Sequence, residues 1–252
     1  MKPMERIFLT IFLIIILAPQ TAQSAPKDQK PKELSASQIL GRADYFAKII
    51  IKKRDLKTKH IQVSQLAGSL VEYQGDFYVI TAAHGFPKDP MIIAYDVRVQ
   101  FKYRIGYVYH AVPLVIDQDS DFAILRIEDK EFHFGGKLPI LGNAEALKDG
   151  DRVFALGHPD DQDLGGSWRI TTGKVLDTRC VTDGASDNPG LSGKWLIKHS
   201  CFTSGGNSGG PIVNSRGEIV GVHIRRINKN EKLAVPINVI MARLVSITAP
   251  SK

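Results

Sequence analysis

The sequence predicts an all-β protein made of two six-stranded antiparallel β-barrels with a short C-terminal helix. From residue 61 onward, short apolar runs alternate with turn residues, which is the pattern of a sandwich or barrel. Helical periodicity is nearly absent, and the strand rhythm begins again after a stretch at residues 137–151 that contains Pro139 and Gly142. Roughly 228 residues, the length without the first 24, suit two small barrels that share a core.

Residues 1–24 are predicted to be a signal peptide, because a basic start is followed by an apolar run over residues 7–18 and by small residues at 22–24. The apolar run has about a dozen residues, whereas a membrane span needs roughly 20. We therefore expect an exported protein, periplasmic or secreted, that begins near Ala25 and keeps no stable membrane span after cleavage. An uncleaved membrane anchor is the alternative.

Residues 25–46 are predicted to form a basic leader and a short helix. Ser35 or Ser37 could cap this helix, which we expect to run through Phe46. Whether the segment is a removed propeptide stays open. Lysines cluster here and again at residues 52–59, and the whole chain carries a net charge of +7. Few aromatic residues stand between these lysines, so we expect no nucleic-acid partner, while loose attraction to an anionic membrane or wall polymer stays open.

The N-terminal barrel is predicted to cover residues 47–136. The hairpin at residues 74–76 connects two of its strands, and the return strand leads to His84. We place the strands of this barrel at residues 48–52, 68–73, 77–81, 91–95, 97–103, 107–115 and 122–127.

The C-terminal barrel is predicted to cover residues 137–252 and to include the closing helix at residues 239–246. We place its strands at residues 152–157, 168–177, 194–198, 211–214, 218–224 and 233–238.

The loop Thr203–Pro211 carries a serine with glycines on both sides. A serine hydroxyl is a poor nucleophile unless a base lies within reach and the backbone can approach the substrate closely. The glycines permit positive φ angles that could turn the amides of Gly206 and Ser208 toward one point, where an oxyanion would form. A glycine-rich turn between two strands is the alternative interpretation.

Two further stretches supply the groups that would activate such a serine. His84 ends a strand-like run and could accept the serine proton, and Asp121 opens another apolar run, from which it could orient the histidine. Asp117 and Asp119 lie nearby as alternatives to Asp121.

With the motifs TAAHG, DFAIL and GNSGGP in this order, the chain resembles the trypsin-like (chymotrypsin-fold) serine peptidases of the bacterial exported type from about Gly68 onward. Residues 233–238 resemble the strand-to-helix exit of the protease domain of high-temperature-requirement proteases. The resemblance implies a serine endopeptidase (EC 3.4.21) that forms an acyl-enzyme on Ser208, with His84 as general base, Asp121 as the orienting carboxylate, and neither a metal nor an organic cofactor.

The resemblance also suggests which bond is cut. Thr203 and His223 are similar in type and spacing to the pair with which bacterial glutamyl endopeptidases bind the substrate's glutamate. Phe202 stands where a trypsin-like preference for Lys or Arg would need a carboxylate. We therefore predict a preference for Glu at the cleavage site, since a hydroxyl and an imidazole N–H can both donate to a carboxylate.

Cys180 and Cys201 are the only cysteines, and export would favour a disulfide between them. Two buried free thiols are the alternative. A zinc site is not expected, because no second pair of ligands stands at metal spacing.

The remaining histidines receive ordinary structural interpretations. We expect a turn to account for His158, and we expect surface or strand positions for His60, His110, His133 and His199.

The partners that we expect are protein or peptide substrates, bound by a monomer. Two other function classes stay open: a catalytically weak peptidase homologue that acts as a binding module, and a wall-associated structural protein that uses its basic leader.

Overall fold

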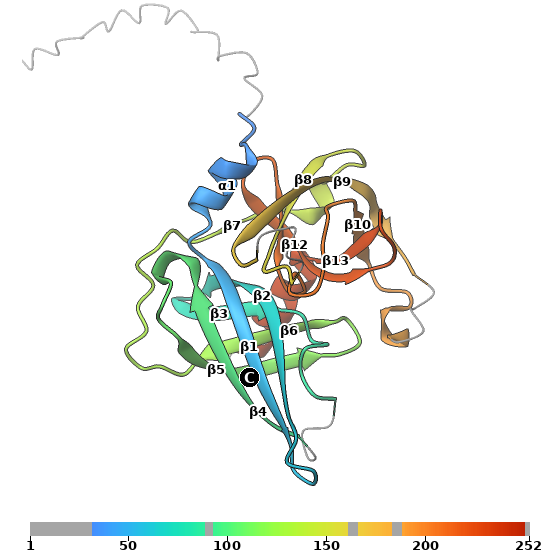
Figure 1. The fold of residues 1–252 in the computed structure, drawn as a ribbon. Coiled ribbons are helices and arrows are strands. Elements are labelled where there is room, and N and C mark those ends of the chain that lie inside the picture. The colour runs from blue at the N-terminus through green and yellow to red at the C-terminus, as the bar shows by residue number, and fades with distance from the viewer. Residues whose placement is uncertain (1–31, 89–92, 161–165, 183–187, 250–252) are drawn as a thin grey trace, which may run out of the picture. The chain divides into compact units, whose positions relative to one another are not determined.

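The computed structural model describes residues 32–88, 93–160, 166–182 and 188–249. The first six strands form a closed antiparallel barrel in the order β1-β2-β3-β6-β5-β4 (Figure 1). Along β1, Ile49 and Ile51 are buried inside the barrel and Lys52 is exposed, as the alternation of strand side chains requires. The strands are β1 (Phe46–Asp55), β2 (Ile61–Tyr73), β3 (Asp76–Thr81), β4 (Ile93–Phe101), β5 (Tyr109–Asp117) and β6 (Phe122–Ile127).

The other strands form a second barrel. Their sheet has the order β11-β8-β9-β10-β13-β12-β7, and an additional β11–β12 pairing closes six of them, with β7 added in parallel to β12. The strands are β7 (Ile140–Leu141), β8 (Arg152–Gly157), β9 (Arg169–Cys180), β10 (Leu196–His199), β11 (Pro211–Asn214), β12 (Glu218–Arg226) and β13 (Lys232–Pro236). The predicted all-β fold of two six-stranded barrels with a short C-terminal helix is confirmed.

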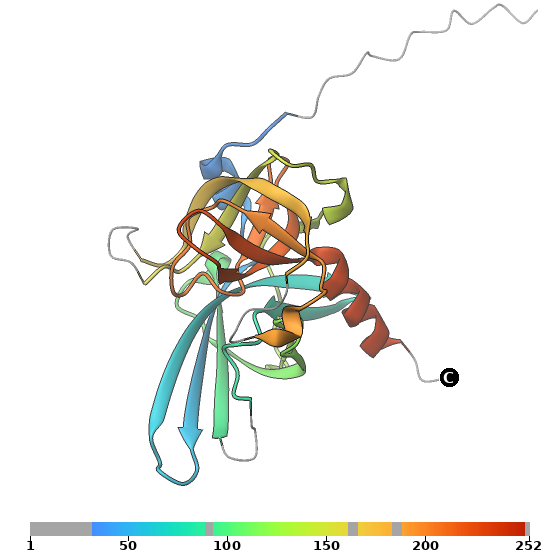
Figure 2. The same cartoon turned by 90° about the vertical axis from the view of Figure 1, so that its right-hand side faces the viewer.

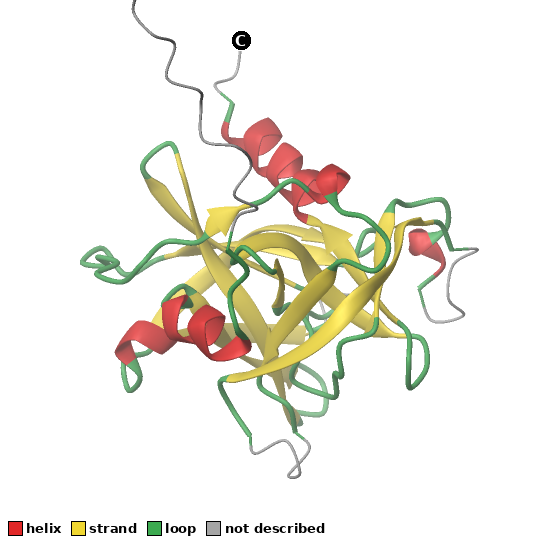
Figure 3. Cartoon of the chain, turned by 90° about the horizontal axis from the view of Figure 1, so that it is seen from above, coloured by secondary structure: helices red, strands yellow, loops and turns green. Residues whose placement is uncertain are grey.

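Helices contribute little to the described chain, and Figure 3 shows them at the periphery of the strands. Ser35 is the N-cap of the first helix and exchanges two hydrogen bonds with Gln38. Of the two predicted N-cap residues, Ser35 and Ser37, it is therefore Ser35 that caps the helix. The helix ends before the predicted Phe46, because Phe46 is already the buried first residue of β1. The helices are α1 (Ala36–Arg42), α2 (Ile237–Thr248), and the 3-10 turns Lys102–Arg104, Ala144–Ala146 and Pro189–Leu191.

The strand boundaries differ from the sequence prediction mainly around β1, β2 and β4. The two strands expected at residues 91–95 and 97–103 are one strand, β4, within the described residues. Asp96 is accommodated inside this strand because it lies opposite Lys52 in the β1–β4 pairing and its carboxylate accepts from Arg98 Nε at 2.8 Å. Strand β1 extends past its predicted end and β2 begins before its predicted start, so the two strands form a long hairpin (Figure 2).

His158 connects the two barrels instead of occupying the simple turn that the sequence suggests. Its ring is fully buried and stacks on Phe46, with 4.7 Å between ring centroids. The backbone N–H of Trp168 donates to Nδ1 at 3.1 Å, so Nε2 carries the proton and donates to the Ala47 carbonyl at 3.0 Å. Burial therefore lowers the pKa of His158 to about 4, and the positive charge of Lys48 acts in the same direction.

This histidine makes the fold sensitive to acid. Between pH 6.5 and 4 the unfolded chain binds a proton at residue 158 while the folded chain does not, so the contribution is complete above pH 6.5 and is lost as pH falls toward 4. Over this interval the contribution of His158 to the free energy of unfolding changes by about 3 kcal/mol. Denaturant unfolding at several pH values should show stability falling over this interval, less steeply in His158→Gln. The exposed control His60→Gln should keep the wild-type slope; equal slopes in all three proteins would contradict the assignment.

The predicted Cys180–Cys201 disulfide is wrong: both thiols are free and buried. Cys180 lies opposite Leu196 at the end of β9, whereas the backbone of Cys201 packs against Gly173 near the start of that strand. Seven strand residues separate these points, or about 23 Å, which is far beyond the span of a disulfide. The β9–β10 pairing holds the two cysteines apart.

The predicted signal peptide, residues 1–24, lies outside the described residues. Among the helices of the described ranges, none has the length and apolar character needed to cross a membrane.

Candidate active site

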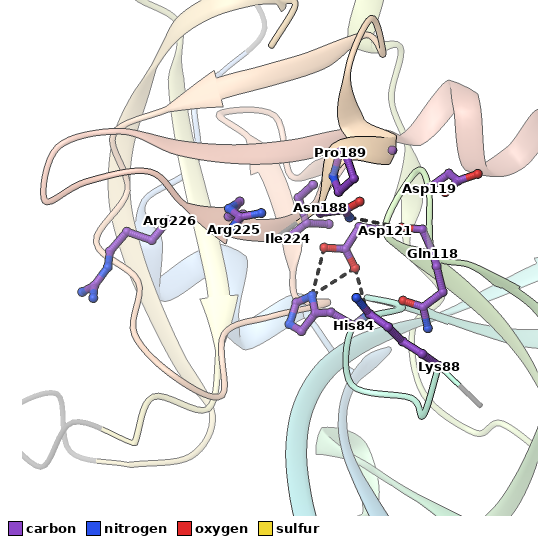
Figure 4. A pocket seen from close by; sticks show the side chains of 11 residues that line it. His84, Lys88, Gln118, Asp119, Asp121, Asn188, Pro189, Ile224, Arg225 and Arg226 are labelled. Atoms are coloured by element: carbon purple, nitrogen blue, oxygen red, sulfur yellow. Dashed lines mark hydrogen bonds and ion pairs between the residues drawn. The ribbon is translucent and has the colours of Figure 1, made fainter. Parts of the chain in front are cut away.

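The end of β3 and the start of β6 bring His84 and Asp121 together (Figure 4). The imidazole Nδ1 lies 2.9 Å from Oδ2 and 3.0 Å from Oδ1 of Asp121. The backbone N–H groups of Ala83 and His84 also donate to Oδ1, at 3.1 and 2.9 Å. Asp121 adopts a φ of +55°, which short polar residues tolerate better than others. The buried carboxylate is thus fixed against a half-exposed histidine.

The two alternative carboxylates have other surroundings. Asp117 accepts from the Ser120 N–H at 2.8 Å and so closes the turn before Asp121. Asp119 is exposed and lies beside Gly190. Among these three acids, only Asp121 contacts His84 within the described part of the chain.

The serine loop is docked against the first barrel. The Ala67 N–H donates to the Ser208 carbonyl at 2.8 Å, and the Gly209 N–H donates to the His223 carbonyl at 2.7 Å. Gly209 has a φ of +83°, and a Cβ there would collide with Thr81 and Ala67. Only glycine fits this position, because it tolerates the positive φ and leaves room for the neighbouring strand.

The amides expected to form an oxyanion hole are available. Gly206 has a φ of +79°. Its carbonyl accepts from the backbone N–H of His158 at 3.1 Å, and this hydrogen bond anchors the loop to the residue that follows β8. Within the described residues, neither the Gly206 N–H nor the Ser208 N–H donates a hydrogen bond. Two unengaged donors in this loop are suited to an anionic oxygen.

His84 and Ser208 line two neighbouring cavities. A cavity of about 590 Å³, the large cavity, contains His84 and Asp121 (Figure 4), and one of about 190 Å³, the serine pocket, contains Ser208. Both are walled by residues 224–226 at the end of β12. In the described chain, no hydrogen bond joins Ser208 Oγ to His84. Catalytic hydrogen bonds of this kind are often loose until substrate binds.

The serine pocket is lined by both residues that the sequence predicted for substrate binding. Thr203 is buried, and its hydroxyl has no hydrogen-bond partner in the described residues. His223 is buried next to it in the wall of the pocket. The Phe202 side chain, by contrast, is 42% exposed and does not line the pocket. A buried hydroxyl without a partner costs free energy unless a ligand satisfies it.

His199 was expected to be a surface or strand residue; it lies in strand β10 but is fully buried behind the pocket. Its Nε2 lies 3.3 Å from His223 Nδ1, while its Nδ1 has no partner among the described residues. A buried nitrogen without a hydrogen-bond partner costs less free energy if it carries a lone pair than if it carries a proton. We therefore leave His199 Nδ1 unprotonated and assign the proton to Nε2, which donates to His223 Nδ1. With Nδ1 accepting from His199, the proton of the neutral His223 ring lies on Nε2.

A buried lysine, which the sequence analysis missed, completes this cluster. Lys232 is 2% exposed and lies directly opposite His199 in the β10–β13 pairing, so both side chains leave the same face of the sheet. Its ammonium donates to the Lys229 carbonyl at 2.6 Å. In the sequence Lys232 follows Glu231 at the end of a polar stretch, so no local signal marks it as buried, and only the strand register shows its neighbour.

Burial and positive charge keep both histidines neutral. Burial lowers the pKa of His223 to about 3, and the neighbouring His84 and Lys232 lower it further. Burial also lowers the pKa of His199 well below its usual range, and His223 and Lys232 add to the effect. The pocket therefore contains a neutral imidazole donor with a cation behind it.

The other histidines stay outside the site: His60, His110 and His133 are exposed, as expected. Among the described residues, no group of three or more His, Cys, Asp and Glu side chains could hold a metal ion.

Two β-barrels with a histidine–carboxylate pair beside a glycine-bracketed serine define the class of the chymotrypsin-like hydrolases. The sequence pattern of the family described as "Trypsin-like peptidase domain" matches residues 67–222. This match covers more than half of the chain, which therefore belongs to the trypsin-like peptidase family.

The chain is also similar to mitochondrial serine protease HTRA2 of several Drosophila species, in agreement with the predicted relation to high-temperature-requirement proteases. It is 32% identical to the D. persimilis protein over 182 residues, which cover 71% of this chain and 38% of that protein. It is 28% identical to the D. ananassae protein over 228 residues, which cover 86% of this chain and 48% of that protein. The chain thus spans less than half the length of these relatives.

Proposed function

We propose that the protein is an exported serine endopeptidase that cleaves after glutamate. In this proposal Ser208 attacks the peptide carbonyl, and His84 accepts the serine proton and later gives it to the leaving amine. Asp121, already bonded to Nδ1, holds the imidazole with Nε2 free to accept and stabilises the imidazolium that forms. The amides of Gly206 and Ser208 stabilise the oxyanion of the tetrahedral intermediate. The basic and apolar start of the sequence supports export.

One observation supports the preference for glutamate most directly: the buried Thr203 hydroxyl, which has no hydrogen-bond partner among the described residues, lines the same pocket as the buried ring of His223. The Thr203 hydroxyl has no partner, and His223 Nε2 carries a proton in the tautomer assigned above. A glutamate carboxylate in the pocket would accept from both groups. Hydrogen bonds to a charged acceptor are stronger than neutral ones, so the gain is greater for glutamate than for glutamine.

The surrounding charge supports the same choice. A buried carboxylate needs a compensating positive charge nearby. Lys232 supplies one from behind the histidine pair, and Arg225 and Arg226 line the pocket wall. The described residues that line the pocket include no acid. A basic substrate side chain would therefore be repelled.

Paired peptide substrates that differ only in Glu or Gln at the cleavage site test this proposal. We expect kcat/KM to favour Glu by at least about tenfold, because one charged hydrogen bond is worth roughly 1.5–3 kcal/mol. His223→Ala should reduce cleavage after Glu by about 10- to 100-fold and cleavage after Gln only slightly. Lys232→Met should reduce cleavage after Glu by about tenfold if its charge acts across the histidine pair.

The matched control is His110→Ala, which removes an exposed histidine and should change neither rate. If kcat/KM fell equally for the Glu and Gln substrates in the His223 and Lys232 variants, these residues would only support the fold. A peptide-library preference for small apolar residues that persists in His223→Ala would overturn the glutamate preference, while the peptidase activity would stand.

A further inference from the structure

The β1–β2 hairpin, with β4 paired along the other edge of β1 as far as Asp55, forms a narrow projection of the first barrel (Figure 1; Figure 2). The two strands pair as far as Arg54 opposite Ile61, whereas β2 pairs with β3 only over Ser69–Tyr73. The outer edge of β2 at residues 61–64 therefore has no strand beside it within the described chain. We call residues 52–63 the hairpin tip.

The hairpin tip concentrates positive charge. Residues 52–59 contain five lysines and arginines and one acid, a net charge of +4 out of +7 for the whole chain. The acid, Asp55, closes the turn, because its Oδ1 accepts from the backbone N–H groups of Lys57 and Thr58 at 2.8 and 2.7 Å. Lys52, Arg54, Lys57 and Lys59 are exposed, whereas Lys53 is half-buried, and Asp96 of β4 lies opposite Lys52.

Large apolar side chains are exposed among these cations. Leu56, Ile61 and Val63 are 43%, 58% and 56% exposed. In the strand register Ile61 lies opposite Arg54 and Val63 opposite Lys52, so each apolar side chain stands beside a cation on the same face. An exposed apolar edge would be a site of self-association unless charges guard it or another surface covers it.

From this arrangement we propose that the hairpin tip binds the surface of an anionic lipid bilayer. Lys52, Arg54 and the lysines of the turn contact lipid phosphates, while Leu56, Ile61 and Val63 enter the headgroup region. Cations combined with apolar side chains are characteristic of interfacial binding, and anionic lipids attract each added cation. Nucleic acid fits less well, because residues 52–63 contain no Phe, Tyr or Trp on which a base could stack, and the exposed apolar side chains among the cations are Leu56, Ile61 and Val63.

Sedimentation with lipid vesicles tests the proposal with the chain that begins at Ala25. Every described helix and strand begins at Ala36 or later, so this chain keeps both barrels without the apolar segment at residues 7–18. We expect it to sediment with phosphatidylcholine vesicles that contain phosphatidylglycerol, and to bind vesicles of phosphatidylcholine alone at least about tenfold more weakly. Added salt should release it.

Two variants separate the charged and apolar contributions. The charge variant, in which Lys52, Arg54, Lys57 and Lys59 become Gln, should bind anionic vesicles at least about tenfold more weakly. The apolar variant combines Leu56→Ser, Ile61→Thr and Val63→Thr, and should lose affinity several-fold. A charge-matched control replaces the exposed lysines 130, 137, 148 and 194 by Gln, and should stay within about twofold of wild type.

Circular dichroism checks that the variants are folded, and cleavage of a short peptide should be unchanged in all of them. Equal weakening in the charge variant and the charge-matched control would overturn the proposal, because net charge alone would explain binding. Loss of vesicle binding in millimolar inorganic phosphate, with no effect of the apolar variant, would indicate a site for free phosphate instead. Tighter binding to duplex DNA than to anionic vesicles would likewise overturn it.

Discussion

Replacing Ser208 by alanine is expected to reduce peptide hydrolysis by about 10⁴- to 10⁶-fold while leaving the fold intact. The nucleophile is lost, and what remains is the effect of binding and of the oxyanion hole. The fold should not change, because backbone hydrogen bonds hold the loop: the Ser208 carbonyl accepts from the Ala67 N–H, and the Gly209 N–H donates to the His223 carbonyl. The thermal midpoint should therefore stay close to that of the wild type.

Labelling with a serine-reactive fluorophosphonate tests whether Ser208 is the nucleophile and does not depend on the peptide substrate used. It should label the wild type at Ser208 and fail to label Ser208→Ala. The control is Ser204→Ala, which changes a neighbouring serine of the pocket and should leave labelling intact. Labelling that survives in Ser208→Ala would overturn the assignment, and a folded wild type that neither reacts nor turns over any peptide would favour the binding-module alternative.

Replacing Asp121 by asparagine is expected to lower kcat by about 10⁴-fold, again without unfolding. Asparagine can keep the φ of +55°, and its Oδ1 can still accept from the N–H groups of Ala83 and His84. Its amide nitrogen, however, would donate where the carboxylate now accepts. His84 Nδ1 would then have to accept, which moves the ring proton to Nε2 and leaves the histidine unable to take the serine proton.

The matched control is Asp119→Asn, which changes an exposed acid in the wall of the same large cavity. It should keep kcat within a few-fold of the wild type, because Asp119 does not contact His84 within the described residues. Comparable losses of kcat in both variants would mean that the negative charge of the cavity matters and not the bond to His84. A loss confined to KM in Asp121→Asn would also contradict the proposed role.

Much of the fold can be predicted from the sequence, because many of its strands are marked by local patterns of apolar and turn residues. Strands β6, β8 and β11 have the predicted ends, since each is a compact apolar run bounded by turn residues or acids. Long-range pairing decided the cases that differ. Asp96 does not interrupt β4, because β1 pairs continuously alongside it, and β2 extends seven residues before its predicted start because β1 extends with it.

The family and the candidate residues His84, Asp121 and Ser208 could be predicted from the sequence, because each residue stands in a short motif that can be recognised without knowledge of the fold. Which distant side chains come into contact depends on how the strands pair. The β9–β10 pairing separates Cys180 from Cys201 and rules out their disulfide. The same sheet places His199 behind His223 and Lys232 opposite His199. These contacts depend on strand register, and a shift of one residue would turn each of those side chains to the other face, which no local pattern can specify.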